Sequence, residues 1–388
     1  MTKSKLTKVG YELEDVNIIQ APISNIRHRS ECDPMIEMCG RRVYPVIVAP
    51  MGAVTDENNY KTWLDNGFIC VIPRTVALEK RISLSKETFA SFSLTEAQAL
   101  AGRALIVGPE FMKDKRYICI DIAHGTMSEL YSTCDMLKDT FGDKVEIMTG
   151  NVATPKAYEY YARHKIDYMR ACIGTGSRCT TTSNVGVHYP TATLIDELRM
   201  EKESSENCYE MKFTDFIVDG GIKNFDDIQK CLCLGAYAVM SGSVFAKAKE
   251  AYEPIVFLHP DNLNMADAIP AEEYYDKLKE LKEKSDLMES EDNEYWDSYR
   301  KLSKRKPYRL YYGMSTKKAQ KLTGGSGKVT SEGIAKPIPV EYPIAKWAED
   351  MADYLRSCMS YTGCRTIEKL RQETELIING SGRNSYWK

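Results

Sequence analysis

Short apolar runs rich in β-branched residues alternate with longer mixed stretches along the first two thirds of the chain. Near-continuous apolar runs are typical of strands buried on both faces, as in a parallel sheet. The stretches between them have the length and spacing of amphipathic helices. The eight runs are 46–49, 68–72, 104–107, 117–120, 146–148, 168–173, 215–218 and 236–240.

Eight strands in succession, separated by helical stretches, favour a (β/α)8 barrel over an open doubly wound sheet. The sequence also lacks the second glycine-rich dinucleotide unit of an open sheet built from two halves. We therefore expect one α/β catalytic domain over residues 1–388. In such a barrel the chemistry belongs to the loops that follow the strands, so the candidate site residues are sought there.

Two segments do not fit the strand–helix alternation. Residues 251–307 contain a charged helix candidate, Ala271 to Met288, with Tyr274 on its apolar face, followed by an acidic and a basic patch. We expect a solvated insertion or small subdomain here, and a partner-binding surface is the alternative. Residues 314–337 are rich in Gly, Lys, Ser and Thr, which predicts a mobile flap over the barrel mouth.

Composition narrows the class of protein. Hydrophobic residues make up 43% and charged residues 28%, which is typical of a globular protein and excludes a disordered or fibrous chain. The 52 Lys and Arg residues against 55 Asp and Glu residues give a net charge of -3. A chain with no general basic field is not expected to bind nucleic acid.

The distribution of apolar and cysteine residues predicts a cytoplasmic protein. No apolar run reaches the length of a membrane span, and the first residues lack the apolar core of a signal peptide. The twelve cysteines are scattered without a CxxC pair, so we expect reduced thiols. The five histidines form no zinc-ligand spacing with them, and no zinc site is expected.

The most informative loop follows the sixth strand and runs from Gly174 to Thr181. Its glycines and Ser177 predict a turn whose N–H groups face a phosphate or whose carbonyls face a cation. Cys179 lies beside Arg178 in this loop, a setting that lowers a thiol pKa and favours a nucleophile. The alternative is an inert structural thiol, the usual role of one cysteine among many.

Two further motifs end the seventh and eighth strands. Asp219-Gly220-Gly221 follows strand seven, and Gly242-Ser243 follows strand eight. In barrels these two loops commonly bind a phosphate, because glycine lets the backbone approach the ligand closely. Asp219 is placed to hold a ribose diol.

With these motifs, the sequence resembles the IMP dehydrogenase/GMP reductase family. The resemblance covers nearly the whole chain except residues 251–307 and the last few residues. It implies a (β/α)8 barrel that binds a purine mononucleotide at the strand ends beside a nicotinamide cofactor. It also implies a covalent thioimidate on the loop cysteine and a homotetramer, often stacked into an octamer. The shared segments are Ala49-Pro-Met51, Gly150-Asn151, Gly174 to Thr181, Asp219-Gly-Gly221, Gly242-Ser243 and Gly313-Met-Ser315.

The resemblance also implies roles for individual residues. Cys179, Thr181 and Glu332 would be catalytic. The cofactor would lie near Arg74, Asp121, Ala123 and Thr181, and a potassium ion could bind backbone carbonyls of Gly174, Gly176 and Cys179. The residues implied to contact the nucleotide are Met51, Ser177, Asp219, Gly220, Gly221, Gly242, Ser243, Tyr311, Gly313, Met314, Ser315, Ser331 and Gly333.

Several features are similar to the reductase branch of the family. Only a short stretch separates Arg74 from Ala104, where dehydrogenases usually insert paired regulatory (CBS) domains. Dehydrogenases activate water with an Arg–Tyr pair on the flap, but the segment from Met314 to Glu332 contains neither residue type. The resemblance therefore implies reduction of GMP to IMP and ammonia with NADPH as the cofactor, and NADH is the alternative.

Two alternatives stay open. The first is NAD-dependent oxidation of IMP to XMP, and the second is a catalytically weak regulator that binds purine nucleotides. The regulator is motivated by departures from the family pattern at Gly52, at Pro73-Arg74 and at Val329. Arg309, like Tyr311, is expected to point into the purine pocket.

Overall fold

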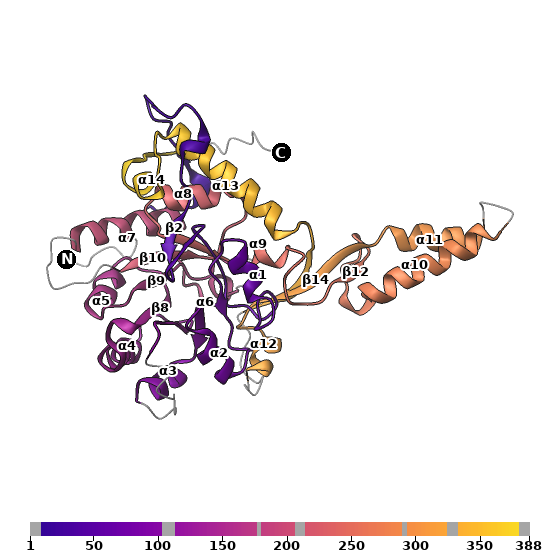
Figure 1. Ribbon diagram of the computed structural model, residues 1–388, viewed down its shortest axis with the longest axis horizontal. Helices are drawn as coiled ribbons and strands as arrows, with labels where there is room; N and C mark the ends of the chain where they lie inside the picture. The colour runs from indigo at the N-terminus through magenta and orange to yellow at the C-terminus, as the bar shows by residue number, and fades with distance from the viewer. Residues whose placement is uncertain are drawn as a thin grey trace.

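Eight parallel strands form a closed barrel in the computed structural model (Figure 1). Each barrel strand pairs with its neighbours in chain order. The barrel closes where the N–H of Val48 donates to the carbonyl of Ile69 at 2.9 Å, next to a bridge between Val48 and Cys70. The predicted (β/α)8 barrel is thereby confirmed. Its strands are β4 (Val46–Val48), β5 (Val71–Ile72), β6 (Phe89–Phe92), β7 (Arg116–Asp121), β8 (Val145–Val152), β9 (Tyr168–Ala171), β10 (Asp215–Asp219) and β11 (Ala238–Ser241).

The structure describes most of the chain. The described residues are 9–102, 113–176, 180–205, 214–288, 293–323 and 333–379.

Seven of the eight predicted runs overlap a barrel strand. The prediction that residues 104–107 form the third barrel strand was wrong. The third strand is β6, which pairs with both β5 and β7, so no further strand fits between them. Its four residues are all buried, but Ser91 interrupts the apolar run. The predicted strand 104–107 lies outside the described residues.

Helices follow the strands and cover the outside of the barrel (Figure 1). Capping side chains mark where helices begin. At the start of α3, the N–H of Glu96 donates to Oγ of Ser93 at 3.2 Å, and the N–H of Ser93 donates to Oε2 of Glu96. The helices are α1 (Tyr60–Asp65), α2 (Leu78–Leu84), α3 (Leu94–Ala101), α4 (Ser128–Phe141), α5 (Ala157–Arg163), α6 (Thr181–Val185), α7 (Thr191–Ser205), α8 (Phe225–Cys233), α9 (Ser243–Ala246), α13 (Ile344–Tyr361) and α14 (Ile367–Glu373).

An arm projects from the barrel after α9 (Figure 1). Its base is an antiparallel sheet of β12 (Val256–Leu258), β13 (Ile269–Pro270), β14 (Lys306–Tyr312) and β15 (Ala335–Pro339). Its outer part consists of α10 (Ala271–Asp286) and α11 (Glu294–Ser303), which pack on each other. The helix expected from Ala271 is α10, and Tyr274 on its buried side stacks on Phe257 with ring centroids 3.7 Å apart.

Part of the segment expected to form a mobile flap has regular structure. Residues 317–322 form α12 (Lys317–Leu322), and residues 335–337 belong to β15, which pairs with β14. Residues 324–332 lie outside the described part. The strand β14 leads directly into Gly313 and Met314, so the arm's sheet and the barrel mouth are joined by one continuous strand.

The two ends of the described chain meet on the outside of the barrel. The strand β1 (Val16–Ile18) pairs antiparallel with β16 (Leu376–Ile378), and the short hairpin β2 (Ile36–Met38) and β3 (Arg41–Val43) follows β1. Among the described residues, no helix has the length and apolar character needed to span a bilayer. The ten cysteines in this part are all unpaired and buried.

Candidate functional site

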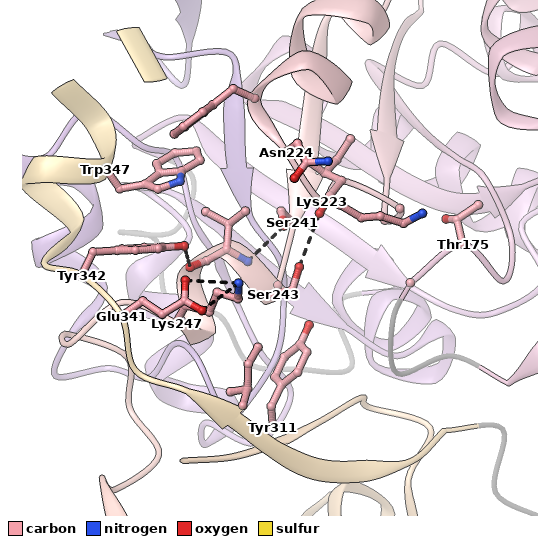
Figure 2. Close-up of a pocket in the computed structure, with 18 of the residues that line it drawn as sticks. Thr175, Lys223, Asn224, Ser241, Ser243, Lys247, Tyr311, Glu341, Tyr342 and Trp347 are labelled. Carbon is pink, nitrogen blue, oxygen red and sulfur yellow. Dashed lines mark hydrogen bonds and ion pairs between the residues drawn. The ribbon is translucent and has the colours of Figure 1, made fainter. Parts of the chain in front are cut away.

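Two adjoining cavities open at the carboxyl ends of the barrel strands. The first, which we call the central cavity, has a volume of about 320 Å³ and is lined by loops after β4, β7, β9, β10 and β14. The second, the side cavity, has a volume of about 670 Å³ and lies between the loops after β10 and β11 and the helix α13 (Figure 2). Both are lined by Thr175, Gly176, Gly220, Gly242 and Tyr311, so they form one cleft.

A buried arginine joins the two acidic residues of the central cavity. Arg170 on β9 donates from Nη1 to Asp121 at 2.7 Å and from Nη2 to Asp219 at 2.7 Å. Only 6% of its side chain is exposed. Burial by itself would lower the pKa of Arg170, but the two carboxylates raise that pKa well above its ordinary value. The guanidinium therefore stays charged and fixes both carboxylates.

Asp219 has one oxygen occupied by the protein. Its Oδ2 accepts from Arg170 and, at 2.8 Å, from Nδ2 of Asn151. In the described part of the chain no hydrogen bond to its Oδ1 is formed, and Asp219 lines the central cavity. This arrangement suits a ligand that offers hydroxyl donors, such as a ribose.

Cys172 also lines the central cavity, but its environment opposes a nucleophilic role. Burial raises the pKa of the Cys172 thiol well above its ordinary value, and burial raises the pKa of Cys119, which accepts from Arg170, to about 12. Both thiols stay protonated near neutral pH, and a protonated thiol is a poor nucleophile.

The loop after β11 approaches Met51 and Tyr311 very closely. A Cβ atom added to Gly242 would lie 2.2 Å from Sδ of Met51 and 2.5 Å from the hydroxyl of Tyr311. Only glycine is therefore tolerated here without movement of both side chains. The hydroxyl of Tyr311 lies 3.2 Å from Sδ of Met51, so the two side chains form a common wall of the cavity.

The boundary between the cavities is made of backbone and small side chains. Gly220 and Gly221 have φ values of 97° and 79°, which only glycine adopts readily, and they are followed by Lys223. Ser243 donates a long bond to the carbonyl of Ile222 at 3.5 Å (Figure 2). Glycine backbone next to a hydroxyl and a lysine is a suitable environment for a phosphate group.

Arg74 also lines the central cavity and provides an unused donor there. Its Nε lies 3.9 Å from Oδ2 of Asp121 and, although buried, has no hydrogen-bond partner among the described residues. A buried donor without a partner is costly, and a bound oxygen would relieve that cost. The residues here thus fit the amide or phosphate oxygens of a nicotinamide cofactor.

The structure brings most of the predicted site residues together. Gly221 and Ser243 line the side cavity, whereas Gly333 is buried and lines neither cavity. Ser177, Cys179, Ser331 and Glu332 lie outside the described residues. The predicted residues that line the central cavity are Met51, Arg74, Asp121, Ala123, Gly174, Gly176, Thr181, Asp219, Gly220, Gly242, Tyr311, Gly313, Met314 and Ser315.

Arg170 was not found from the sequence, Asn151 belongs to the shared Gly150-Asn151 segment but was given no role, and one expectation was wrong. Arg170 and Asn151 hold Asp219, and the available signal for Arg170 was a charged residue inside an apolar strand. Arg309 does not reach the cleft: it is fully buried and donates to the carbonyls of Ala251 and Lys249. Burial lowers the pKa of Arg309 to about 10.

The departure at Gly52 has a local explanation. A Cβ atom at this position would lie 2.8 Å from Oγ1 and 2.9 Å from Cγ2 of Thr75. Thr75 follows Arg74 in the loop after β5, so Gly52 allows the loops after β4 and β5 to pack closely. A larger side chain at position 52 would require Thr75, the residue after Arg74, to move.

Comparison with known proteins gives a family. The sequence matches the family described as "IMP dehydrogenase / GMP reductase domain" over residues 14–265 and 297–383, which is most of the chain. The interval between the two matched segments contains α10. Relatives named IMP dehydrogenase and relatives named GMP reductase match this chain at similar levels of sequence identity.

Three relatives illustrate this. An inosine-5'-monophosphate dehydrogenase from Chlorobaculum parvum is 28% identical over 260 residues, which cover 67% of this chain and 44% of the relative. A GMP reductase from Shouchella clausii is 30% identical over 254 residues, covering 62% of this chain and 72% of the relative. A GMP reductase from Buchnera aphidicola is 28% identical over 264 residues, covering 68% and 60%. The matched region thus spans less than half of the dehydrogenase.

Proposed function

Because the chain belongs to the IMP dehydrogenase / GMP reductase family of oxidoreductases, we propose that it reductively deaminates GMP. In this reaction GMP, NADPH and two protons give IMP, NADP⁺ and ammonium. The observation that carries the choice of branch is the absence of Arg and Tyr between Met314 and Glu332. Hydrolysis of a thioimidate needs an activated water, whereas reductive deamination does not.

Residues of this chain would divide the chemistry as follows. The thiolate of Cys179 forms a bond to C2 of the purine, and Thr181 and Glu332 deliver the proton with which the 2-amino group leaves as ammonia. When bound, the nicotinamide cofactor supplies the hydride that C2 receives. The bond between C2 and Cys179 then breaks, and the electron pair returns to sulfur. Thr181 lines the central cavity, which supports its place next to the reacting carbon.

The cleft offers matching groups for the rest of the ligands. The phosphate would be held at the boundary of the cavities by Ser177, the glycines after β10 and β11, and Ser243. Asp219 would bind the ribose through its Oδ1, and Met51 would pack on the base. Arg74 and Asp121 would face the nicotinamide. A potassium ion on carbonyls of the loop that begins at Gly174 remains part of the proposal.

The test is a pair of steady-state assays followed at the nicotinamide absorbance. We expect NADPH oxidation and ammonia release with GMP, and slow or no NAD reduction with IMP. Cys179→Ala should abolish turnover while calorimetry still detects nucleotide binding, because removal of a covalent nucleophile costs several orders of magnitude in rate. A matched control is Cys134→Ala, at a fully buried cysteine on α4.

Other outcomes would select the alternatives. Sustained formation of XMP from IMP and NAD, faster than IMP formation from GMP, would assign the chain to the dehydrogenase branch. Nucleotide binding without turnover in either direction would indicate a regulator. The same assay, run with NADH and with NADPH, shows which of the two cofactors the protein uses.

The proposed setting is a homotetramer or octamer in the cytoplasm. The unpaired, buried cysteines of the described part agree with a reducing compartment. Light scattering of the purified chain would measure the assembly directly, and a monomer at assay concentration would contradict it.

A further inference from the structure

The side cavity is larger than a single phosphate group needs. Its volume is about 670 Å³, compared with about 320 Å³ for the central cavity. The proposed phosphate site uses only the boundary, where Gly220 and Gly242 line both cavities. Cavities of this size are typical of sites for small organic ligands. The cleft therefore has room for a second group attached to the phosphate of the nucleotide.

Aromatic side chains form a wall of the side cavity on the side away from Thr175 (Figure 2). The ring centroid of Trp347 on α13 lies 5.4 Å from that of Phe225 and 6.5 Å from that of Tyr342. The hydroxyl of Tyr342 donates to the carbonyl of Val244 at 2.9 Å, which holds this ring in place. Aromatic side chains contact flat heterocycles favourably, in offset-stacked or edge-on arrangements.

Trp347 also offers a hydrogen-bond donor that the described part of the protein does not use. The residue lines the side cavity, and only 8% of it is exposed. Among the described residues, no acceptor is bonded to its indole N–H. The N–H of a buried tryptophan usually finds a partner, because an unsatisfied buried donor is costly. A ligand with a carbonyl oxygen or a ring nitrogen would satisfy this donor.

The lysines of the side cavity favour an uncharged group over a further phosphate. Each of them is paired with a carboxylate of the protein, and a further phosphate would have to compete with that carboxylate. The pairs are Lys247 with Glu341 at 3.1 Å, Lys346 with Asp350 at 2.8 Å, and Lys223 with Glu14 at 2.7 Å. The aromatic wall therefore suits a neutral heterocycle, with the phosphate charge kept at the glycine-rich boundary.

We propose that the side cavity binds a second nucleoside esterified to the phosphate of the nucleotide, so that the whole cleft takes a dinucleoside monophosphate. The proposal rests on the proposed function, which places the base of GMP in the central cavity and its phosphate at the boundary. The base of the second nucleoside then lies against Trp347 and accepts from its N–H. Such a ligand competes with GMP for the cleft.

Calorimetry with two isomeric dinucleotides tests the direction of this extension. Uridylyl-3',5'-guanosine carries the uridine on the 5'-phosphate of guanosine, whereas guanylyl-3',5'-uridine has the same composition and charge but no 5'-phosphate on guanosine. We expect the first isomer to bind at least about tenfold more tightly than the second, because only the first can place both bases, and stacking of a base on an aromatic ring contributes this much.

GDP separates the second base from a second phosphate. It extends GMP by a charged group without a heterocycle. We expect its dissociation constant to lie within about threefold of that of GMP, because surface lysines that are already paired add little. An affinity of GDP equal to that of uridylyl-3',5'-guanosine would overturn the proposal, since the phosphate alone would then explain the gain.

Trp347→Phe keeps the aromatic wall and removes the N–H. It should weaken binding of uridylyl-3',5'-guanosine by about threefold to tenfold, as expected for one neutral hydrogen bond, and change GMP binding by less than about twofold. Trp63→Phe is the matched control. Trp63 is fully buried, packs on Phe245 as Trp347 does, and also has an indole nitrogen without a partner in the described part, but it lines neither cavity. Its affinities should equal those of the parent.

Tryptophan fluorescence provides a second measurement that needs no variant. Uridylyl-3',5'-guanosine should quench the emission of the parent protein and GMP should not, because only the dinucleotide places a base against Trp347. Equal affinities of the two isomers, equal quenching by GMP and the dinucleotide, or an equal loss of both affinities in Trp347→Phe would overturn the proposal. Absence of GMP turnover would overturn the proposed function alone, because these readouts measure binding. Absence of GMP binding would overturn both.

Discussion

Arg170 connects two carboxylates that the sequence assigns to different ligands, Asp219 to the ribose and Asp121 to the cofactor. Its guanidinium lies between β7 and β10, with 13% and 14% of the two acidic side chains exposed. A pair buried to this degree contributes little net stability, but removal of one partner leaves the others uncompensated. The same residue therefore couples the geometry of both halves of the cleft to the stability of the barrel.

Replacement of Arg170 by Met should destabilise the protein by about 3–5 kcal/mol, because two carboxylates would remain buried without a cation. Urea unfolding monitored by circular dichroism measures this change. Arg163→Met is the matched control, since Arg163 pairs with Glu159 in solvent and such pairs contribute about 0–1 kcal/mol. An equal shift of the two unfolding midpoints would show that the buried arginine has no special role.

The residue scale also shows where sequence reasoning succeeds. Asp219, Gly220 and Gly242 could be predicted, because glycines and an acid at strand ends form contiguous motifs. The contact between Oε1 of Glu12 and Nε2 of His188, which lie 2.6 Å apart, could not, because it joins positions far apart in the sequence. Cys179 and Glu332 stay predictions, since they lie outside the described residues.

At the scale of elements, the barrel strands could be predicted from the sequence because they are buried on both faces. The strand β4 is buried throughout and its sequence is an apolar run, and β9 is apolar except for Arg170. The strand β6 is equally buried but has Ser91 in its interior, and it was missed. The charged helical pattern predicted the helix of the arm. The pairing of β12 with β14, through which the arm is attached, could not be predicted because the two strands are far apart in the sequence.

We expect the arm to unfold locally without unfolding of the barrel. Tyr274→Ala removes a ring that is stacked on Phe257 and almost fully buried, which should loosen α10 at a cost of about 3–5 kcal/mol. We expect limited proteolysis to cut faster within residues 275–303, with GMP turnover changed by less than about twofold.

Tyr275→Ala is the control for the arm, because 60% of Tyr275 is exposed. It should leave the rate of proteolysis close to that of the parent. If Tyr274→Ala abolished turnover together with arm stability, the arm and the barrel would have to be treated as one cooperative unit.

At the scale of the whole molecule, the C-terminal end supports the cleft through the N-terminal segment. The strand β16 pairs with β1, and the N–H of Asn379 donates to the carbonyl of Asp15 at 2.8 Å. The side chain of Asp15 in turn accepts from the N–H of Glu12 at 2.9 Å. A chain of contacts thus leads from the last described residues to Glu12, and from there to His188 and the loop after β9.

Truncation after Glu373 tests this connection. Removal of residues 374–388 deletes β16 and Asn379, so β1 becomes an unpaired edge and the backbone of Glu12 loses support. We expect the barrel to remain folded by circular dichroism but to lose about 1–3 kcal/mol of stability, with kcat reduced by about tenfold, as for a displaced loop. Truncation after Gly380 keeps every contact named here and should retain parent stability and turnover. If truncation after Glu373 also retained turnover, the N-terminal segment would be held by its contacts to α7 and α8 alone. The C-terminal strand β16 would then have no part in positioning the cleft.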